Sequence, residues 1–370
     1  MRQEDKEALL TELEEIDNID DESESEDSGI VQYNISTYGA DLDVEGIVRR
    51  LRKQEIFIPE FQRNFVWKLP EASRFIESLL LGLPVPGIFL ARDPRTNRLL
   101  VIDGQQRLKT LLFFYDGHFN PTASDGTQRI FKLTKIESQF EGKTYNTLKD
   151  PDRFILDNAI IHASIVKQDF PQDNNSSIYH IFERLNNGGR ILTPQEIRCA
   201  VYHGKLIGFI HNLNQSEHWR RIYGRKNTRL KDEELILRFF ALYYGHSEYK
   251  KPMKEFLNTF AEKFKDLQPE EEGVFRKLFT ETLKTVYNSI GERAFRIENA
   301  LNAAIFDSVA IGIAKRIEKG PISNETDLRE AYHRLLKDKD YLDAVSQSTA
   351  SENLVRQRIA SSISAFEILQ

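Results

Sequence analysis

Several absences in the 370-residue sequence limit the class of protein it can encode. Its single cysteine, Cys199, excludes an internal disulfide and a cysteine-rich zinc site. It has no long apolar run without charges, so we expect no transmembrane helix. The first residues are too acidic for a signal peptide, and we therefore expect a cytoplasmic protein. A Walker-type phosphate loop is also absent.

Negative charge is concentrated at the start of the chain. Residues 1–29 carry 13 acidic and 2 basic side chains, a net charge of −11. The other 341 residues carry 44 acidic and 49 basic side chains, a net charge of +5. Like charges repel one another, so we expect residues 1–37 to form a disordered tail. This tail either covers a basic groove or is a solvated extension.

The spacing of apolar residues predicts an α+β region followed by helices. Strands are predicted at residues 56–58, 87–91, 99–102, 129–133 and 159–167, with a hairpin between the second and the third. Helices are predicted at residues 43–53, 71–81, 108–115, 178–185, 194–202, 235–244, 253–264, 271–287, 296–317, 325–336 and 352–366. We expect an α+β domain over residues 38–172 and an all-α helical domain over residues 173–370.

One stretch, residues 99–112, joins a predicted strand directly to a predicted helix. Between them lie only polar residues and one glycine: Asp103, Gly104, Gln105, Gln106 and Arg107. The first amide groups of a helix have no carbonyl partner within it. Together with the positive end of the helix dipole, these amides can bind an anion such as phosphate.

Each residue of this polar run has a functional and a structural interpretation. Gly104 lets the backbone approach a ligand closely, and the Arg107 guanidinium can bind phosphate or carboxylate oxygens. Asp103 could bind a metal ion or a sugar hydroxyl, orient Arg107, or simply cap the helix. Gln105 and Gln106 could orient water or read a base or sugar, or they could be ordinary polar residues at a helix start.

Two other segments contain clustered polar side chains or glycines. Upstream, residues 56–67 contain Gln62, Arg63 and Trp67; the tryptophan could stack on a base or pack in the core. Downstream, residues 186–190 form an Asn-Asn-Gly-Gly-Arg turn. That turn could end a helix, because glycine and asparagine tolerate the left-handed conformation, or it could lie near a ligand.

With these three segments in this order, the sequence resembles one known family over residues 38–202. It is the ParB/sulfiredoxin-like domain of unknown function at the N-terminus of GmrSD-type modification-dependent restriction enzymes. The same domain occurs in a phosphorothioate-sensing anti-phage effector. The resemblance implies the small mixed sheet with helices that ParB and sulfiredoxin share.

The resemblance also implies a nucleotide site. In ParB and sulfiredoxin relatives a Gly-x-x-Arg turn at a helix start holds nucleotide phosphates, and residues 104–107 match it. The implied cofactor is a nucleoside triphosphate with Mg²⁺, for which Asp103 is a candidate ligand. The candidate catalytic residues are Asp103, Gln105, Gln106 and Arg107. The candidate nucleotide-binding residues are Gln62, Arg63, Gly104, Arg107, Lys109, Thr110, Asn187, Gly188, Gly189 and Arg190.

Many relatives carry a C-terminal His-Asn-His nuclease domain, which needs clustered metal ligands. Here the histidines of the C-terminal half are widely spread, at positions 203, 211, 218, 246 and 333. A separate nuclease or another defence-system subunit is therefore an expected partner, with DNA and a second copy of this chain. No membrane is expected as a partner.

Three functions remain open. The first is a restriction-type defence component that binds and hydrolyses a nucleoside triphosphate to regulate DNA recognition or cleavage. The second is a non-hydrolysing DNA-binding or adaptor module that acts with a separate nuclease. The third is an enzyme that nicks DNA or excises a base, using Asp103 and Arg107.

We expect deletion of residues 1–29 to leave the thermal unfolding midpoint unchanged, because this segment has little apolar surface to bury. The deletion removes a net charge of −11. If the tail covers a basic groove, the truncated protein binds duplex DNA more tightly, and the gain shrinks as salt rises. Fluorescence anisotropy measures this, and an unchanged DNA affinity would favour the solvated extension.

Overall fold

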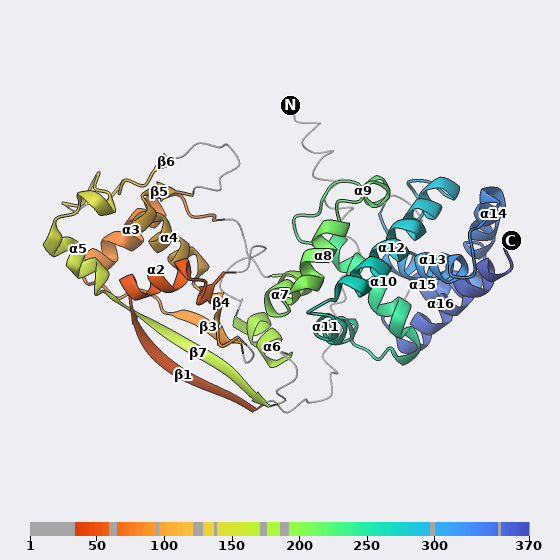
Figure 1. The fold of residues 1–370 in the computed structure, drawn as a ribbon, viewed down its shortest axis with the longest axis horizontal. Helices are drawn as coiled ribbons and strands as arrows, with labels where there is room; N and C mark the ends of the chain where they lie inside the picture. Colours follow the sequence, from red (N-terminus) through yellow and green to blue (C-terminus); the bar gives the residue numbers. More distant parts are fainter. Residues whose placement is uncertain are drawn as a thin grey trace. The chain divides into compact units, whose positions relative to one another are not determined.

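The computed structural model describes nine stretches of the chain: residues 34–58, 65–93, 96–120, 129–136, 139–170, 176–185, 192–296, 300–346 and 349–369. Residues 1–33 of the predicted tail lie outside these stretches. The described chain forms two compact units (Figure 1). We call residues 34–192 with Cys199–Val201 the N-terminal unit, and the remaining described residues from Thr193 onward the helical unit.

A five-stranded mixed sheet is the base of the N-terminal unit, with strand order β1-β7-β3-β4-β2 (Figure 1). The strands are β1 (Asn34–Asp43), β2 (Ile56–Phe57), β3 (Ile88–Arg92), β4 (Leu99–Asp103) and β7 (Ile160–Phe170). β3 and β4 are antiparallel, which confirms the predicted hairpin, whereas β4 pairs with β2 and β3 with β7 in parallel. β1 pairs with β7 and forms one edge of the sheet, and the sequence does not predict it. The expected disordered tail includes its first four residues, 34–37, and that part of the prediction is wrong because they pair with β7.

Helices pack against this sheet around one apolar core. They are α2 (Val44–Arg52), α3 (Leu69–Leu80), α4 (Gln105–Asp116) and α5 (Asp150–Asp157), while α6 (Ser176–Leu185) contacts β4 and β7. Local sequence sets their ends. The Asp43 carboxylate accepts a hydrogen bond from the Gly46 amide at 2.6 Å and caps α2. Gly117, with φ of 78°, ends α4.

One predicted strand is shorter than expected. The sequence predicts a strand at residues 129–133, but only β6 (Arg129–Ile130) forms, paired with β5 (His118–Phe119). Beyond Ile130 the backbone bonds elsewhere, since the Leu133 amide donates to the Lys143 carbonyl at 2.9 Å. The predicted strand therefore ends at Ile130, and Leu133 pairs instead with residues 142 and 143, since its carbonyl also accepts from the Gly142 amide at 2.8 Å.

The named elements of the helical unit are helices. They are α7 (Pro194–Val201), which spans the boundary, α8 (Lys205–Leu213), α9 (Glu217–Tyr223), α10 (Lys231–Gly245), η3 (His246–Glu248), α11 (Met253–Lys263), α12 (Pro269–Ser289), α13 (Ala303–Ile317), α14 (Glu325–Leu335), α15 (Lys339–Ser346) and α16 (Glu352–Glu367). These elements confirm the expected fold class: α+β with a small mixed sheet, then an all-α helical region. Among the helices that the structure describes, none combines the length and apolar composition needed to cross a membrane.

The most buried helix, α13, begins later than predicted. The expected helix at residues 296–317 starts instead at Ala303. Arg296 forms a bridge with Leu301, and the Asn302 side chain then accepts a hydrogen bond from the Ile305 amide at 2.9 Å. This asparagine cap places the helix start where apolar spacing alone could not.

A buried ionic cluster ties α13 to its neighbours. Arg238 of α10 donates through Nε to both oxygens of Asp307 on α13, at 3.0 and 2.8 Å. Arg358 of α16 donates through Nη2 to Asp307 Oδ2 at 3.1 Å. All three side chains are at most 5% exposed. Charges this deeply buried are tolerated only when paired, so the cluster fixes how the three helices meet.

We expect Gly312→Ala to destabilise the helical unit by about 1–3 kcal/mol, because the added methyl group overpacks the contact between α13 and α16. Its Cβ would lie 2.5 Å from Ser362 Oγ and 2.9 Å from the Ser362 carbonyl carbon. The matched control is Gly273→Ala in α12, where a Cβ meets nothing within 4 Å. There alanine should stabilise by about 0.5–1 kcal/mol. Urea unfolding measures both, and equal effects would contradict a tight crossing at Gly312.

Candidate functional site

The predicted strand-to-helix junction is present and contains a single connecting residue. β4 ends at Asp103, α4 begins at Gln105, and Gly104 between them adopts φ of 98°. A Cβ on Gly104 would lie 2.5 Å from the Ile88 Cγ2 atom of β3. Glycine is therefore required twice, by the left-handed backbone and by the approach of β3.

Asp103 and Arg107 form an ion pair at this junction. Arg107 Nη2 donates to Asp103 Oδ2 at 2.8 Å. The Arg107 side chain is 15% exposed and the Asp103 side chain 57%, so the carboxylate faces solvent while most of the guanidinium side chain is set into the surface. The interpretation of Asp103 as the helix cap is wrong, because Gly104 is the N-cap and no side chain caps α4. Asp103 instead orients Arg107.

The Arg107 guanidinium has unused hydrogen-bonding capacity. Its Nε is buried and has no acceptor among the residues that the structure describes. The Nε atoms of five other arginines share this feature, so it does not by itself mark a ligand site. The first-turn amides of α4 have no partner within the helix, and the helix dipole is positive at this end. These features together make the start of α4 suited to an anion.

Gln106 links this junction to the segment that precedes α3. Its Oε1 accepts hydrogen bonds from the backbone amides of Val66 at 3.0 Å and Trp67 at 3.3 Å. The same segment is anchored by its rings, since Trp67 packs edge-on to Phe75 with ring centroids 5.7 Å apart. Trp67 thus has the core packing that was one of its two interpretations. The Gln106 link was missed because its partners are backbone amides about 40 residues away, which no sequence pattern marks.

The other predicted site residues are either partly buried, fully buried or outside the described residues. Gln105 lies half-buried in the first turn of α4. Lys109 is partly buried, and burial lowers the pKa of its ammonium group. Thr110 is fully buried, so its side chain faces the core. Six further candidates lie outside the described residues, and their roles stay predictions: Gln62, Arg63, Asn187, Gly188, Gly189 and Arg190.

The described residues fit a nucleoside triphosphate with Mg²⁺. Phosphate oxygens suit the α4 amides and Arg107, and the exposed Asp103 carboxylate is an oxygen ligand of the kind Mg²⁺ prefers. Within the described stretches, no three His, Cys, Asp or Glu side chains gather as metal ligands. A magnesium ion here would thus take one carboxylate from these residues and fill its other positions with phosphate oxygens and water, as is usual for nucleotide-bound Mg²⁺.

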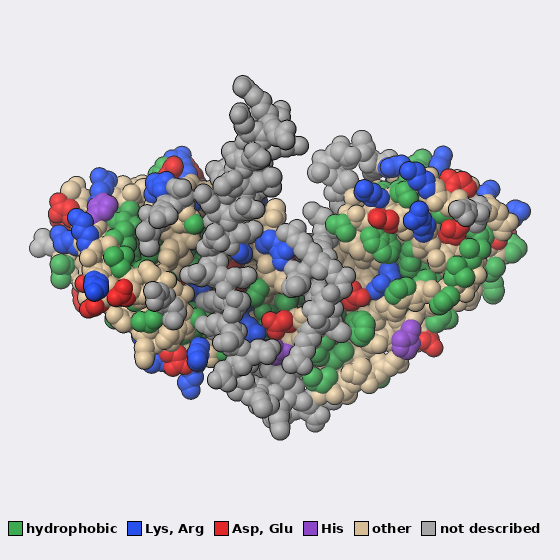
Figure 2. All heavy atoms as spheres, turned by 180° about the vertical axis from the view of Figure 1, so that it is seen from behind, with side chains coloured by type: hydrophobic (Ala, Val, Ile, Leu, Met, Phe, Trp, Pro, Cys, Tyr) green, Lys and Arg blue, Asp and Glu red, His purple; other side chains and the backbone are tan. Residues whose placement is uncertain are grey.

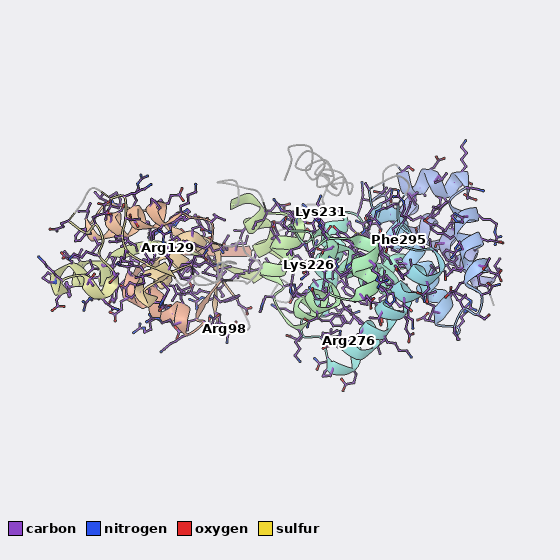
Figure 3. All side chains as sticks on the ribbon, turned by 90° about the horizontal axis from the view of Figure 1, so that it is seen from above. Arg98, Arg129, Lys226, Lys231, Arg276 and Phe295 are labelled. Carbon is purple, nitrogen blue, oxygen red and sulfur yellow. The ribbon has the colours of Figure 1, made fainter. Side chains whose placement is uncertain are left out.

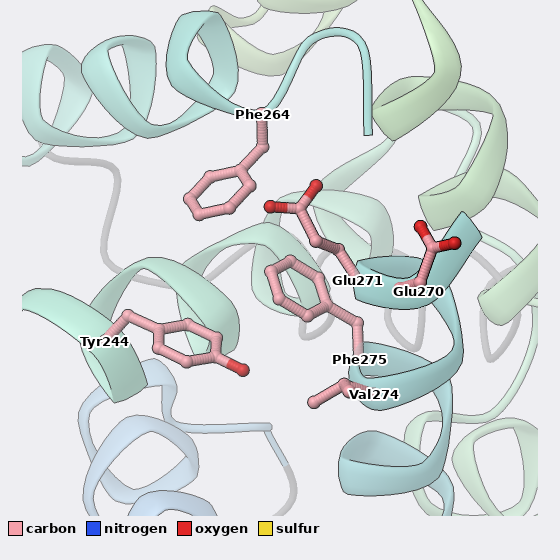
Figure 4. Close-up of a pocket in the computed structure, with 6 residues that line it drawn as sticks. All are labelled: Tyr244, Phe264, Glu270, Glu271, Val274 and Phe275. Atoms are coloured by element: carbon pink, nitrogen blue, oxygen red, sulfur yellow. The ribbon is translucent and has the colours of Figure 1, made fainter. Parts of the chain in front are cut away.

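A hollow of about 380 Å³ in the helical unit is lined by acidic and apolar side chains, which do not suit an anion (Figure 4). Aromatic rings and two carboxylates line it: Tyr244, Phe264, Glu270, Glu271, Val274 and Phe275. Burial raises the pKa of the Tyr244 hydroxyl, and the negative charge of Glu318 raises it further. Carboxylates repel phosphate, so the start of α4 remains the candidate anion site.

Comparison with known proteins supports the resemblance inferred from the sequence. Residues 44–203 match the family model described as the GmrSD restriction endonuclease, N-terminal domain. This match confirms the predicted resemblance for that region and includes the whole β4–α4 junction. An uncharacterized protein of Methanocaldococcus jannaschii is 28% identical over a stretch covering 28% of this chain and 22% of that protein. The similarity thus spans about a fifth of the relative's length.

We expect Gln106→Ala to increase hydrogen exchange at the Val66 and Trp67 amides, because both lose their acceptor. The expected loss of stability is about 1 kcal/mol, at the lower end for an unsatisfied donor, since Val66 is exposed and water can replace the acceptor. Gln106→Glu keeps an acceptor oxygen at the same distance and should keep both amides protected. Equal exchange rates in the parent and both variants would show that Gln106 does not hold this segment.

Proposed function

We propose that the N-terminal unit binds a nucleoside triphosphate with its phosphates at the start of α4. In this proposal, binding regulates DNA recognition or cleavage in a restriction-type defence system. The observation that carries it is the turn at residues 104–107, where the first amides of α4 lie beside the Arg107 guanidinium that Asp103 orients. The match of residues 44–203 to a restriction endonuclease domain supports the link to DNA and defence.

Each residue of the turn has a distinct task in this proposal. Gly104 makes the left-handed turn that places the first amides of α4, and Arg107 donates to the phosphate oxygens. Asp103 holds Arg107 through one oxygen and offers the other to Mg²⁺, which when bound neutralises phosphate charge. Gln106 accepts through Oε1 from the Val66 and Trp67 amides and so holds the neighbouring segment, while Gln105, also in the first turn of α4, is a candidate to orient a water for hydrolysis.

The same donors would also hold a phosphodiester of DNA, which is the basis of the second candidate function. In that case the protein is a non-hydrolysing adaptor, and free nucleotides do not bind. A third function, nicking or base excision by Asp103 and Arg107, would produce relaxed plasmid or abasic sites. A thermal-shift screen with ATP, GTP, CTP and UTP, each with Mg²⁺ and without DNA, separates the first function from the others.

We expect Arg107→Ala to weaken nucleotide binding about ten- to a hundred-fold, because a charge-assisted phosphate contact contributes about 1.5–3 kcal/mol. Arg107→Lys should recover only part of the affinity, since lysine keeps the charge but loses the planar donor set. The matched control is Arg52→Ala. Arg52 also pairs with an aspartate, Asp116, at the other end of α4, nine residues after Arg107 and so about 14 Å along the helix axis. Isothermal titration calorimetry should find the control unchanged.

Asp103→Asn distinguishes a magnesium ligand from a positioning residue. Asparagine can still accept the hydrogen bond from Arg107, so a positioning role predicts unchanged affinity with and without Mg²⁺. A magnesium role predicts that Mg²⁺ no longer tightens nucleotide binding by the Asp103→Asn variant.

If Arg107→Ala folds by circular dichroism and binds every nucleotide as the parent does, the turn is not a nucleotide site and the adaptor function leads.

A further inference from the structure

The helical unit contains a segment that is basic throughout. Residues 218–231 carry six lysine or arginine side chains and no acidic one. They form most of α9 and the loop into α10, and Lys226 and Lys231 from this segment are labelled in Figure 3. Arg225 and Lys226, in the middle of the loop, are both exposed.

Three acidic residues follow this segment, and each has a partner: Asp232 and Glu233 are buried, whereas the Glu234 side chain is 29% exposed and lies 3.3 Å from Arg198 Nη1. Asp232 is fully buried and lies 3.0 Å from Arg220 Nη1, with Asn214 donating to it at 2.9 Å. Glu233 is 3% exposed and contacts His211 Nδ1 at 2.9 Å. The start of α10 therefore adds little negative charge to the surface beside the loop, although its sequence is acidic.

Hydrogen bonds hold the loop in one conformation. Asn227 Oδ1 accepts from the Arg229 amide at 2.7 Å, and the Asn227 amide donates to Asp232 Oδ2 at 3.3 Å. The Arg229 carbonyl accepts from Thr193 Oγ1 at 3.1 Å, and the Arg229 guanidinium pairs with Glu196 at 3.2 Å.

A second segment, distant in sequence, brings further positive charge to the end of α9. Arg296 donates to the carbonyls of Ile222 at 2.7 Å and Tyr223 at 3.1 Å. Arg293, three residues earlier, is exposed. Two acidic side chains flank the area: Glu217, which pairs with Arg221 at 2.8 Å, and the exposed Glu292. Positive charge remains in excess.

We propose that Arg221, Arg225, Lys226 and Arg293, here called the basic surface, contact the phosphate backbone of duplex DNA. Spaced cations on a rigid support release the counterions of DNA phosphates, which provides sequence-independent affinity. The choice of DNA as the polyanion rests on the proposed function, through the match of residues 44–203 to a restriction endonuclease domain. The basic surface would position DNA, while a modified base or sequence is read elsewhere.

The test uses the double variant Arg225→Gln/Lys226→Gln in the full chain, with a fluorescent duplex and a salt series. Each lost phosphate contact should lower the slope of log affinity against log salt by about 1 and weaken binding about ten-fold near 0.1 M salt. Arg225→Lys keeps the charge and should bind as the parent does. Thermal shift with nucleotide, measured in parallel without DNA, reports the proposed function separately.

The matched control removes the same charge at the other end of α10. Lys250→Gln/Lys251→Gln changes two exposed lysines beyond Gly245, and α10 has 15 residues, or about 22 Å. This exceeds the Debye length of about 8 Å at physiological salt, so the control should bind DNA as the parent does.

Each outcome decides the matter. Weaker DNA binding in the Arg225/Lys226 variant alone, with the nucleotide thermal shift intact, supports the basic surface. An equal loss of DNA affinity in the Lys250/Lys251 control shows a general effect of charge and overturns the basic surface. Polyglutamate serves as a probe for an acidic protein. If the parent binds polyglutamate but not DNA, the basic surface is overturned in favour of an acidic protein partner. A parent that shows a thermal shift with nucleotide but binds no DNA also overturns the basic surface, although the proposed nucleotide binding stands. Loss of the thermal shift with nucleotide alone, with DNA binding intact, counts against the proposed function.

Discussion

The contact between Ile88 of β3 and Gly104 is the constraint on which the candidate site depends. β3 runs so close to the junction that a Cβ at position 104 would overlap Ile88. The chain must therefore turn through a left-handed glycine, and α4 begins directly after the strand. This sharp turn brings Asp103 and Arg107 into an ion pair and places both beside the first amides of α4. A longer connection would separate the carboxylate, the guanidinium and the helix start.

At both candidate binding surfaces, the nearby acidic groups are paired with basic or polar side chains. At the α4 junction, Asp103 holds Arg107 while leaving Nε without an acceptor among the described residues. At the start of α10, Asp232 and Glu233 are buried and paired, and Arg225 and Lys226 project outward. The net charge of the whole chain would identify neither surface, because the −11 of residues 1–29 outweighs the +5 of the other residues.

The parts of the fold that the sequence predicts are those with strong local signals. Branched apolar residues mark β4, and helical spacing marks α4. The prediction misses four short helices, α5, α8, α9 and α15. It also misses β1, whose polar residues interrupt the apolar pattern and whose hydrogen bonds come from β7, more than a hundred residues later. The start of α13 is set by the Asn302 side chain, and the task of Gln106 by amides of another segment. The acidic start of α10 resembles an exposed helix end, and only tertiary packing shows Asp232 and Glu233 to be buried.

The Arg238–Asp307–Arg358 cluster limits the routes by which the helical unit can evolve. Losing Asp307 alone would leave two guanidinium groups facing each other without a counter-charge, and losing either arginine would remove one of the bonds that join neighbouring helices. A wholly apolar set of similar volume could replace all three, but single substitutions must first pass through a poorly stable intermediate. Descendants of this chain should therefore keep the cluster intact or exchange it as a block, while the exposed surface around it diverges freely.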